Sequence, residues 1–183
     1  MLGVQFYATS QRIDRAFFRN AYDVRIILED LVEKTRTATS RSELATLLEH
    51  HLIQALQPAF FAVYLETSDS QLSAAPASVP AELKTISVTQ PLMVDLARRG
   101  RPWEVSENTR GDAPGLFLLA PLRPDCLVPV LGRDSRLVGL LVLGPRLSEE
   151  PYSRDDKHLL ASVASSPLSR RWSNSAEASS MMT

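Results

Sequence analysis

Cysteine and histidine are scarce in this chain of 183 residues, and their scarcity limits the chemistry open to it. The single cysteine, Cys126, excludes an intramolecular disulfide and a cysteine-rich metal site. The three histidines are His50, His51 and His158. Neighbours on a helix diverge by about 100°, so His50 and His51 are unsuited to chelating one ion. We therefore expect no metal site.

Long apolar runs, a charge excess and the common catalytic motifs are also missing. No stretch of about 18 apolar residues is present, so the sequence encodes no membrane-spanning helix. The formal net charge of -1 gives no overall attraction to nucleic acid, and no nucleic-acid partner is expected. The chain has no Gly-x-Gly-x-x-Gly, Walker or Gly-x-Ser-x-Gly motif, and we expect no catalytic residue.

The clearest local pattern lies near the end of the chain. Two apolar runs, Leu127–Leu131 and Leu137–Leu143, flank a short segment rich in turn-forming residues, which predicts a β-hairpin. Ser153 and Asp156 then resemble a capping box, with Asp in place of the usual Glu or Gln, and predict the start of a helix. This half of the chain therefore reads as strand, turn, strand, loop and helix.

The N-terminal region predicts one long helix, because residues 10–37 contain neither Gly nor Pro. Apolar and small side chains recur in it at alternating spacings of four and three residues, the pattern of a coiled-coil seam. We expect a parallel homodimer through this seam, and the alternative is that the helix packs on its own domain. The candidate interface residues are Phe17, Ala21, Val24, Leu28 and Leu31.

Between these regions the chain alternates helices and short strands. Ser40 and Glu43 form a capping box for a helix over residues 40–57 that carries a stripe of leucines and ends at Pro58. The remaining elements are expected as a buried strand at residues 60–65, a short strand near Leu72, a half-buried strand at 83–88, a helix at 91–100, an extended piece at 103–105 and an apolar strand at Leu116–Ala120.

This order favours an α+β fold with an antiparallel sheet of five or six strands, flanking helices and a long N-terminal helix. Three parts are expected: an N-terminal linker or signalling helix at 1–39, a folded domain at 40–166, and a polar tail at 167–183 that we expect to be disordered.

Three segments resemble the GAF domain family: Leu137-Val-Gly-Leu-Leu-Val-Leu-Gly144, the helix entry Pro151-Tyr-Ser-Arg-Asp-Asp156 and, by order, the strand Phe61-Ala-Val-Tyr-Leu65. Residues 13–22 are similar to the linker that precedes such domains in bacterial membrane-anchored sensor histidine kinases and serine phosphatases. The resemblance implies a non-catalytic sensory or regulatory module in signal transduction. It also implies a cytoplasmic location, at the inner face of the membrane in a longer parent protein with a kinase or phosphatase output domain.

By the same resemblance, a small-molecule ligand would lie between the sheet and the segment from Leu83 to Leu122. The candidate lining residues are Leu92, Met93, Leu96, Trp103, Phe117 and Leu119. The alternative is that these large apolar side chains simply fill a core, because few polar groups converge among them. The family's motif for cyclic nucleotides is absent, and the cofactor or ligand stays unknown.

Cys126 supports a different hypothesis, a redox-sensing switch. An exposed thiol close to Arg123 would be a reactive thiolate, whereas a buried one would be an inert small hydrophobe. The sequence context favours the inert reading. A third hypothesis is a ligand-free dimerisation scaffold.

Overall fold

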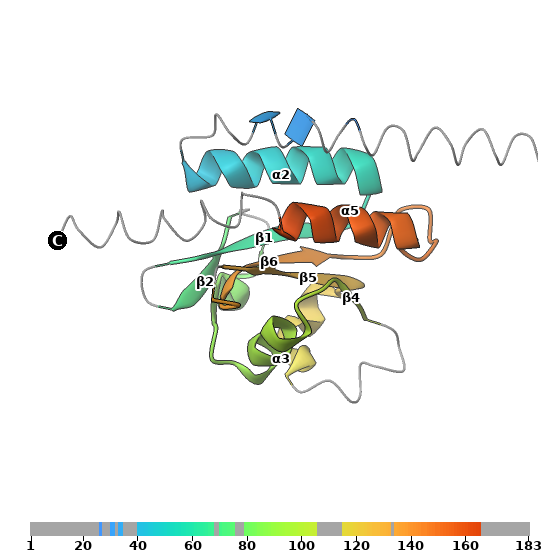
Figure 1. Ribbon diagram of the computed structural model, residues 1–183. Helices are drawn as coiled ribbons and strands as arrows, with labels where there is room; N and C mark the ends of the chain where they lie inside the picture. The colour runs from blue at the N-terminus through green and yellow to red at the C-terminus, as the bar shows by residue number, and fades with distance from the viewer. Residues whose placement is uncertain are drawn as a thin grey trace, which may run out of the picture.

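The structure is a computed structural model that describes residues 26, 30, 31, 33, 34, 40–67, 70–75, 79–105, 115–132 and 134–165 (Figure 1). Most of the predicted N-terminal helix and the whole tail at 167–183 lie outside these residues, as do the interface candidates Phe17, Ala21, Val24 and Leu28. Among the described residues, none of the helices has the length and apolar character needed to cross a bilayer.

A single antiparallel sheet of six strands forms the centre of the fold, in the order β3-β2-β1-β6-β5-β4. This confirms the predicted α+β class and the antiparallel hairpin of β5 and β6. The strands are β1 (Phe61–Glu66), β2 (Gln71–Ala74), β3 (Thr85–Ser87), β4 (Trp103–Glu104), β5 (Cys126–Leu131) and β6 (Leu137–Leu143).

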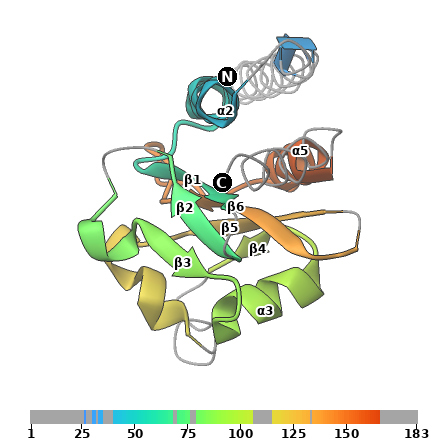
Figure 2. The same ribbon diagram turned by 90° about the vertical axis from the view of Figure 1, so that its left-hand side faces the viewer.

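Helices cover both faces of this sheet (Figures 1 and 2). The helices α2 (Arg41–Leu56) and α5 (Arg154–Ser165) lie on one face, and α3 (Pro91–Arg99) lies on the other with the short 3₁₀ helix η2 (Leu116–Leu122). A second 3₁₀ turn, η1 (Ala81–Leu83), precedes β3. We call these two sides of the sheet the α2/α5 face and the α3 face.

Each face buries its own apolar cluster, because side chains alternate along the strands. In β1, Val63 and Leu65 point to the α2/α5 face, while Ala62 and Tyr64 point to the α3 face. The alternation shifts in β6, where Val130 pairs with Gly139 but Leu131 pairs with Leu137. The extra residue between these pairs is a β-bulge near the hairpin turn.

The N-cap hydrogen bond expected from each predicted capping box is present in the structure. The backbone N–H of Glu43 donates to Ser40 Oγ at 3.1 Å at the start of α2. At the start of α5 the bonds are reciprocal, since Ser153 N–H donates to Asp156 Oδ2 at 2.8 Å and Asp156 N–H donates to Ser153 Oγ at 3.1 Å. Aspartate therefore replaces the longer Glu or Gln of the usual motif without loss of the bond.

The two C-terminal motifs quoted above contact each other directly. The buried hydroxyl of Tyr152 donates to the carbonyl oxygen of Gly144 at 2.6 Å. Gly144 also lies so close to Phe60 that an added Cβ would meet the Phe60 Cβ and backbone nitrogen at 3.2 Å. The end of β6 and the entry to α5 are therefore fixed by a hydrogen bond and a close backbone approach.

One predicted strand is wrong. Leu116–Ala120 was expected to be extended, but this run lies in the 3₁₀ helix η2, with Leu116, Leu119 and Leu122 buried. Burial of every third side chain matches three residues per turn. An uninterrupted apolar run has no periodicity to separate strand from helix. The strand expected at 83–88 is shorter, Thr85–Ser87, after the turn η1.

The described residues of the N-terminal region contact α2. Leu31 is only 1% exposed within the single chain and belongs to the cluster of the α2/α5 face. Asp30 Oδ2 lies 3.1 Å from His51 Nε2 and accepts from Lys34 Nζ at 2.7 Å. One position of the proposed dimer seam, Leu31, therefore packs against its own domain.

Asp156 is the polar residue on which the entry to α5 most depends. It caps the helix and also accepts from Arg146 Nη1 at 3.1 Å, while Arg146 Nε is buried without a partner among the described residues. We expect Asp156→Ala to lower the free energy of unfolding by about 2–4 kcal/mol, because it exposes a helix end and leaves a largely buried cation.

The matched control is Asp155→Ala, in the same helical turn but exposed. Both changes remove one negative charge near the helix N-terminus, so Asp155→Ala is expected to cost about 0.5 kcal/mol or less. Urea denaturation of both variants measures the difference. Equal losses would show that only the helix dipole matters.

Candidate ligand-binding face

The helix α3 defines the face where a ligand was expected. Pro91 stands in its first turn, where the missing N–H costs nothing, and Gly100 ends it in the left-handed conformation with φ of 59°. Leu92, Met93 and Leu96 project from the helix onto the sheet and are fully buried. The local sequence thus places a short amphipathic helix with its apolar side on the α3 face.

The structure brings together five of the six predicted lining residues. Leu92, Met93, Leu96 and Leu119 are fully buried in one cluster, and Trp103 packs against it partly buried. Phe117 is different, because its side chain is 81% exposed. The four fully buried residues pack against strand side chains of the α3 face, as core residues do.

Tyr64 holds one side of this face in place. Its hydroxyl donates to the carbonyl oxygen of Leu83 at 2.9 Å, so it links the central strand β1 to η1. Burial raises the pKa of Tyr64 to about 12, because the phenolate would be desolvated. This buried tyrosine is a neutral hydrogen-bond donor at physiological pH and not an acid-base group.

At one end of the face lies the edge strand β4, only two residues long. Trp103 pairs with Leu127, which belongs to the α3-face cluster. The guanidinium of Arg99, from the last turn of α3, lies 4.5 Å from the centre of the Trp103 ring, and Asp95 Oδ2 holds Arg99 Nε at 2.7 Å. This cation–π contact ties the end of α3 to β4.

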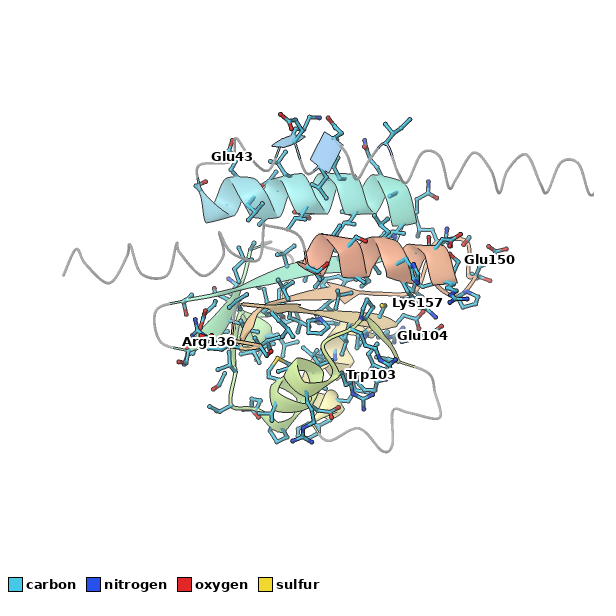
Figure 3. The ribbon with its side chains drawn as sticks, viewed as in Figure 1. Glu43, Trp103, Glu104, Arg136, Glu150 and Lys157 are labelled. Atoms are coloured by element: carbon cyan, nitrogen blue, oxygen red, sulfur yellow. The ribbon has the colours of Figure 1, made fainter. Side chains whose placement is uncertain are left out.

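The next residue of β4 faces the opposite way. Glu104 pairs with Cys126, which lies on the α2/α5 face, and Glu104 Oε2 accepts from Lys157 Nζ of α5 at 2.5 Å. Figure 3 shows Trp103, Glu104 and Lys157 close together at this edge of the sheet. Two successive residues of β4 therefore contact helices on opposite faces.

At the other end of the face, Glu66 is the last residue of β1, and its carboxylate is buried. Its side chain is 2% exposed, and Oε1 accepts from Arg136 Nη1 at 2.5 Å. The second oxygen, Oε2, is buried without a hydrogen-bond partner among the described residues. No local sequence pattern indicates this pair, because the two residues are 70 positions apart and neither forms part of a motif.

Comparison with known proteins shows which known structures this architecture resembles. No protein-family model matches the sequence, and no curated protein matches it. The GAF domain of a phosphoenolpyruvate-protein phosphotransferase from Coxiella burnetii superposes with a TM-score of 0.64 at 13% identity, covering 88% of this chain and 99% of that one. The GAF/HD domain protein of Geobacter sulfurreducens gives 0.58 at 18% identity, covering 74% and 94%.

The chain has a GAF fold. A third neighbour with a known structure is the free methionine-R-sulfoxide reductase of Neisseria meningitidis, solved with its substrate, at a TM-score of 0.63 and 20% identity, covering 86% of this chain and 93% of that one. The architecture expected from the quoted motifs is therefore confirmed. Identities this low show only the fold, so the function of this chain has to be inferred from its own residues.

Cys126 lies in the core of this GAF fold. Its side chain is fully buried on the α2/α5 face, and burial raises the pKa of the thiol to about 12, with a smaller opposing effect from Lys157. The redox hypothesis requires an accessible thiol with a lowered pKa, and the structure shows the opposite of both. Cys126 is a packing residue here.

Metal binding finds no support in the part of the chain that is described. No group of three or more His, Cys, Asp or Glu residues in it is placed to hold an ion. His51 is instead occupied by the carbonyl oxygen of Leu47, 2.8 Å from Nδ1, and by Asp30.

The burial of Cys126 yields a prediction on thiol reactivity. In the native protein at pH 8 we expect no reaction with Ellman's reagent, and one thiol released per chain in denaturant, because the thiol is reached only by unfolding. Stability should fall as the pH rises above about 9, because the unfolded thiol ionises there while the folded one stays neutral until about pH 12.

The control is Cys126→Ala, which should show no signal in either state and a shallower loss of stability above pH 9, the ordinary pKa of a cysteine thiol. Rapid labelling of the folded wild-type protein would restore the redox hypothesis.

Proposed function

We propose that this chain is a non-catalytic sensory or regulatory module of signal transduction, in which the state of the α3 face is transmitted to α5. Three features support a regulatory role: the GAF fold, the absence of the common catalytic motifs in the sequence, and a residue path that joins the two faces. The last of these carries the proposal.

The path runs through β4. Arg99 of α3 packs on Trp103, Trp103 is joined by one peptide bond to Glu104, and Glu104 binds Lys157 of α5. A shift of α3 on the sheet would move the Trp103 ring, and the two-residue strand would carry that movement to α5. Because β4 is a short edge strand that pairs, among the described strands, with β5 alone, it can move with little loss of sheet hydrogen bonds.

An enzyme is the competing function, because one neighbour with the same fold is a sulfoxide reductase. A thiol-based reduction needs an accessible thiolate. Cys126 is the only cysteine in the sequence, and it is buried with a raised pKa. This favours the regulatory function over that enzymatic one.

Hydrogen exchange tests the path. We expect Trp103→Ala to raise amide exchange in the first turns of α5, although Trp103 lies on the other face, because Glu104 loses its anchored position. Exchange in α2 serves as the internal reference for global destabilisation. Lys157→Ala should raise α5 exchange by itself and remove most of the additional effect of Trp103→Ala.

The matched control is Phe117→Ala, which removes an aromatic ring from the α3 side at an exposed position and should leave α5 unchanged. An unchanged α5 in Trp103→Ala, or an equal rise in α2, would refute transmission through β4.

The module is also proposed to act as a parallel homodimer within a longer cytoplasmic signalling protein, at the inner face of the membrane and linked to a kinase or phosphatase output domain. The heptad pattern of residues 17–38 and the similarity of residues 13–22 to signalling linkers support this. Leu31, the fifth interface candidate, packs internally, so the proposal rests on the other four candidates, Phe17, Ala21, Val24 and Leu28.

Light scattering tests the assembly. At tens of micromolar we expect the wild type to be a dimer and Leu28→Glu to be a folded monomer, because a charge in the seam cannot be buried unpaired. Ile53→Glu, at an exposed apolar position of α2, should remain dimeric. A monomeric wild type would rule out the dimer, and a monomeric Ile53→Glu would move the interface to α2.

A further inference from the structure

Glu66 is the most unusual polar residue of the described chain, because it ends a strand that is buried along its whole length. Alternation along β1 puts it on the α3 face with Ala62 and Tyr64. It pairs with Leu72 of β2, and its ion-pair partner Arg136 directly precedes Leu137, the first residue of β6. Leu72 and Leu137 both belong to the apolar cluster of the α3 face.

The carboxylate is therefore held in an apolar setting with half of its hydrogen-bonding capacity unused. An ionised carboxylate accepts at both oxygens, and a buried oxygen without a donor is costly. Arg136 satisfies Oε1 through Nη1, while Oε2 has no partner among the described residues. A core designed only for stability would have an apolar residue here, or a second donor for Oε2.

The side chain of Arg136 is far more exposed than that of its partner Glu66, at 54%. A guanidinium has five N–H donors in a planar fork, and within the described residues Arg136 uses one of them, in the bond from Nη1 to Glu66. The site thus combines a buried acceptor that lacks a donor with an adjacent cation that retains donors toward solvent (Figure 3 labels Arg136 at this end of the sheet).

We propose that Glu66 and Arg136 bind the charged end of a small apolar α-amino acid. The ammonium group donates to Glu66 Oε2, the carboxylate accepts from the exposed side of the Arg136 guanidinium, and the apolar side chain lies toward the cluster that contains Leu72 and Leu137. This inference rests on the proposed sensory function and names the class of ligand that the α3 face would sense.

Charge balance selects this class of ligand over simpler ones. Glu66 and Arg136 already neutralise each other, so a plain amine would leave an excess positive charge at a buried site, and a plain carboxylate would leave Oε2 unpaired. A zwitterion adds no net charge and supplies both a donor and an acceptor. The side chain of Arg136 must shift to admit the ammonium, which its partial exposure allows.

Calorimetry and thermal unfolding of the full chain test this, with leucine, valine, methionine and alanine as probes at up to about 10 mM, where a ligand of millimolar affinity already raises the melting temperature. At least one of the larger three is expected to bind and to stabilise the protein. For leucine, the two half-ligands 3-methylbutylamine and 4-methylpentanoate should each bind at least about tenfold more weakly.

Variants locate the binding site. Glu66→Gln keeps the shape but presents an amide in place of the carboxylate, and Arg136→Met removes the cation, so each should weaken binding of the best probe about tenfold or more. The matched control is Glu150→Gln, the same change at an exposed position on the opposite side of the view in Figure 3, and it should bind like the wild type.

Two results would overturn the assignment. The first is that none of the four probes binds, which would leave Glu66 as a structural residue only. The second is binding that Glu66→Gln leaves unchanged, which would place the ligand elsewhere. Neither result bears on transmission through β4, because the exchange experiment with Trp103→Ala uses no ligand.

Discussion

The antiparallel pairing of β1 with β6 is the constraint on which the rest of this structure depends. Both strands are buried along their whole length, and the pairing runs from Phe61 opposite Leu143 to Leu65 opposite Gly139. A strand that is apolar on both faces is stable only when both are covered. The two layers of helices, and with them the distinct α2/α5 and α3 faces, follow from this requirement.

The same constraint explains where polar chemistry is allowed. In the centre of the sheet, the strand side chains pack into the apolar cluster of one face or the other. Charged groups therefore lie where the strands end or at an edge of the sheet. Glu66 ends β1, and Glu104 lies in the edge strand β4. Because β4 pairs with the start of β5, which lies opposite the end of β6, the two glutamates stand at opposite ends of the strands.

Features set by neighbours in the sequence could be predicted, and features set by distant contacts could not. Both capping boxes, the left-handed Gly100 and the β5–β6 hairpin depend on residues only a few positions apart, so the sequence contains their full physical cause. The strand predicted at Leu116–Ala120 is wrong. The helical form of this run depends on its burial against α3 and the sheet, and no local sequence pattern indicates that burial.

The same distinction between local and distant causes applies to the residues of the candidate site. Leu92, Met93, Leu96 and Leu119 were found because an apolar stripe marks a buried face, but such a stripe is the same for a core and for a pocket lining. What distinguishes this face is a polar pair of residues far apart in the sequence, Glu66 with Arg136; the second long-range pair, Glu104 with Lys157, lies on the opposite face of the sheet.

Those two pairs also differ in how far they are exposed to solvent. Glu104 and Lys157 are each about one-third exposed, so their ion pair contributes little to stability and can break or form as β4 moves. Glu66 is almost completely buried and is only half satisfied, so its environment changes the free energy of the fold much more. Under the proposed sensory function, the Glu66–Arg136 pair at one end of the sheet would bind the ligand, and the weak ion pair at the other end would provide an easily shifted link to α5.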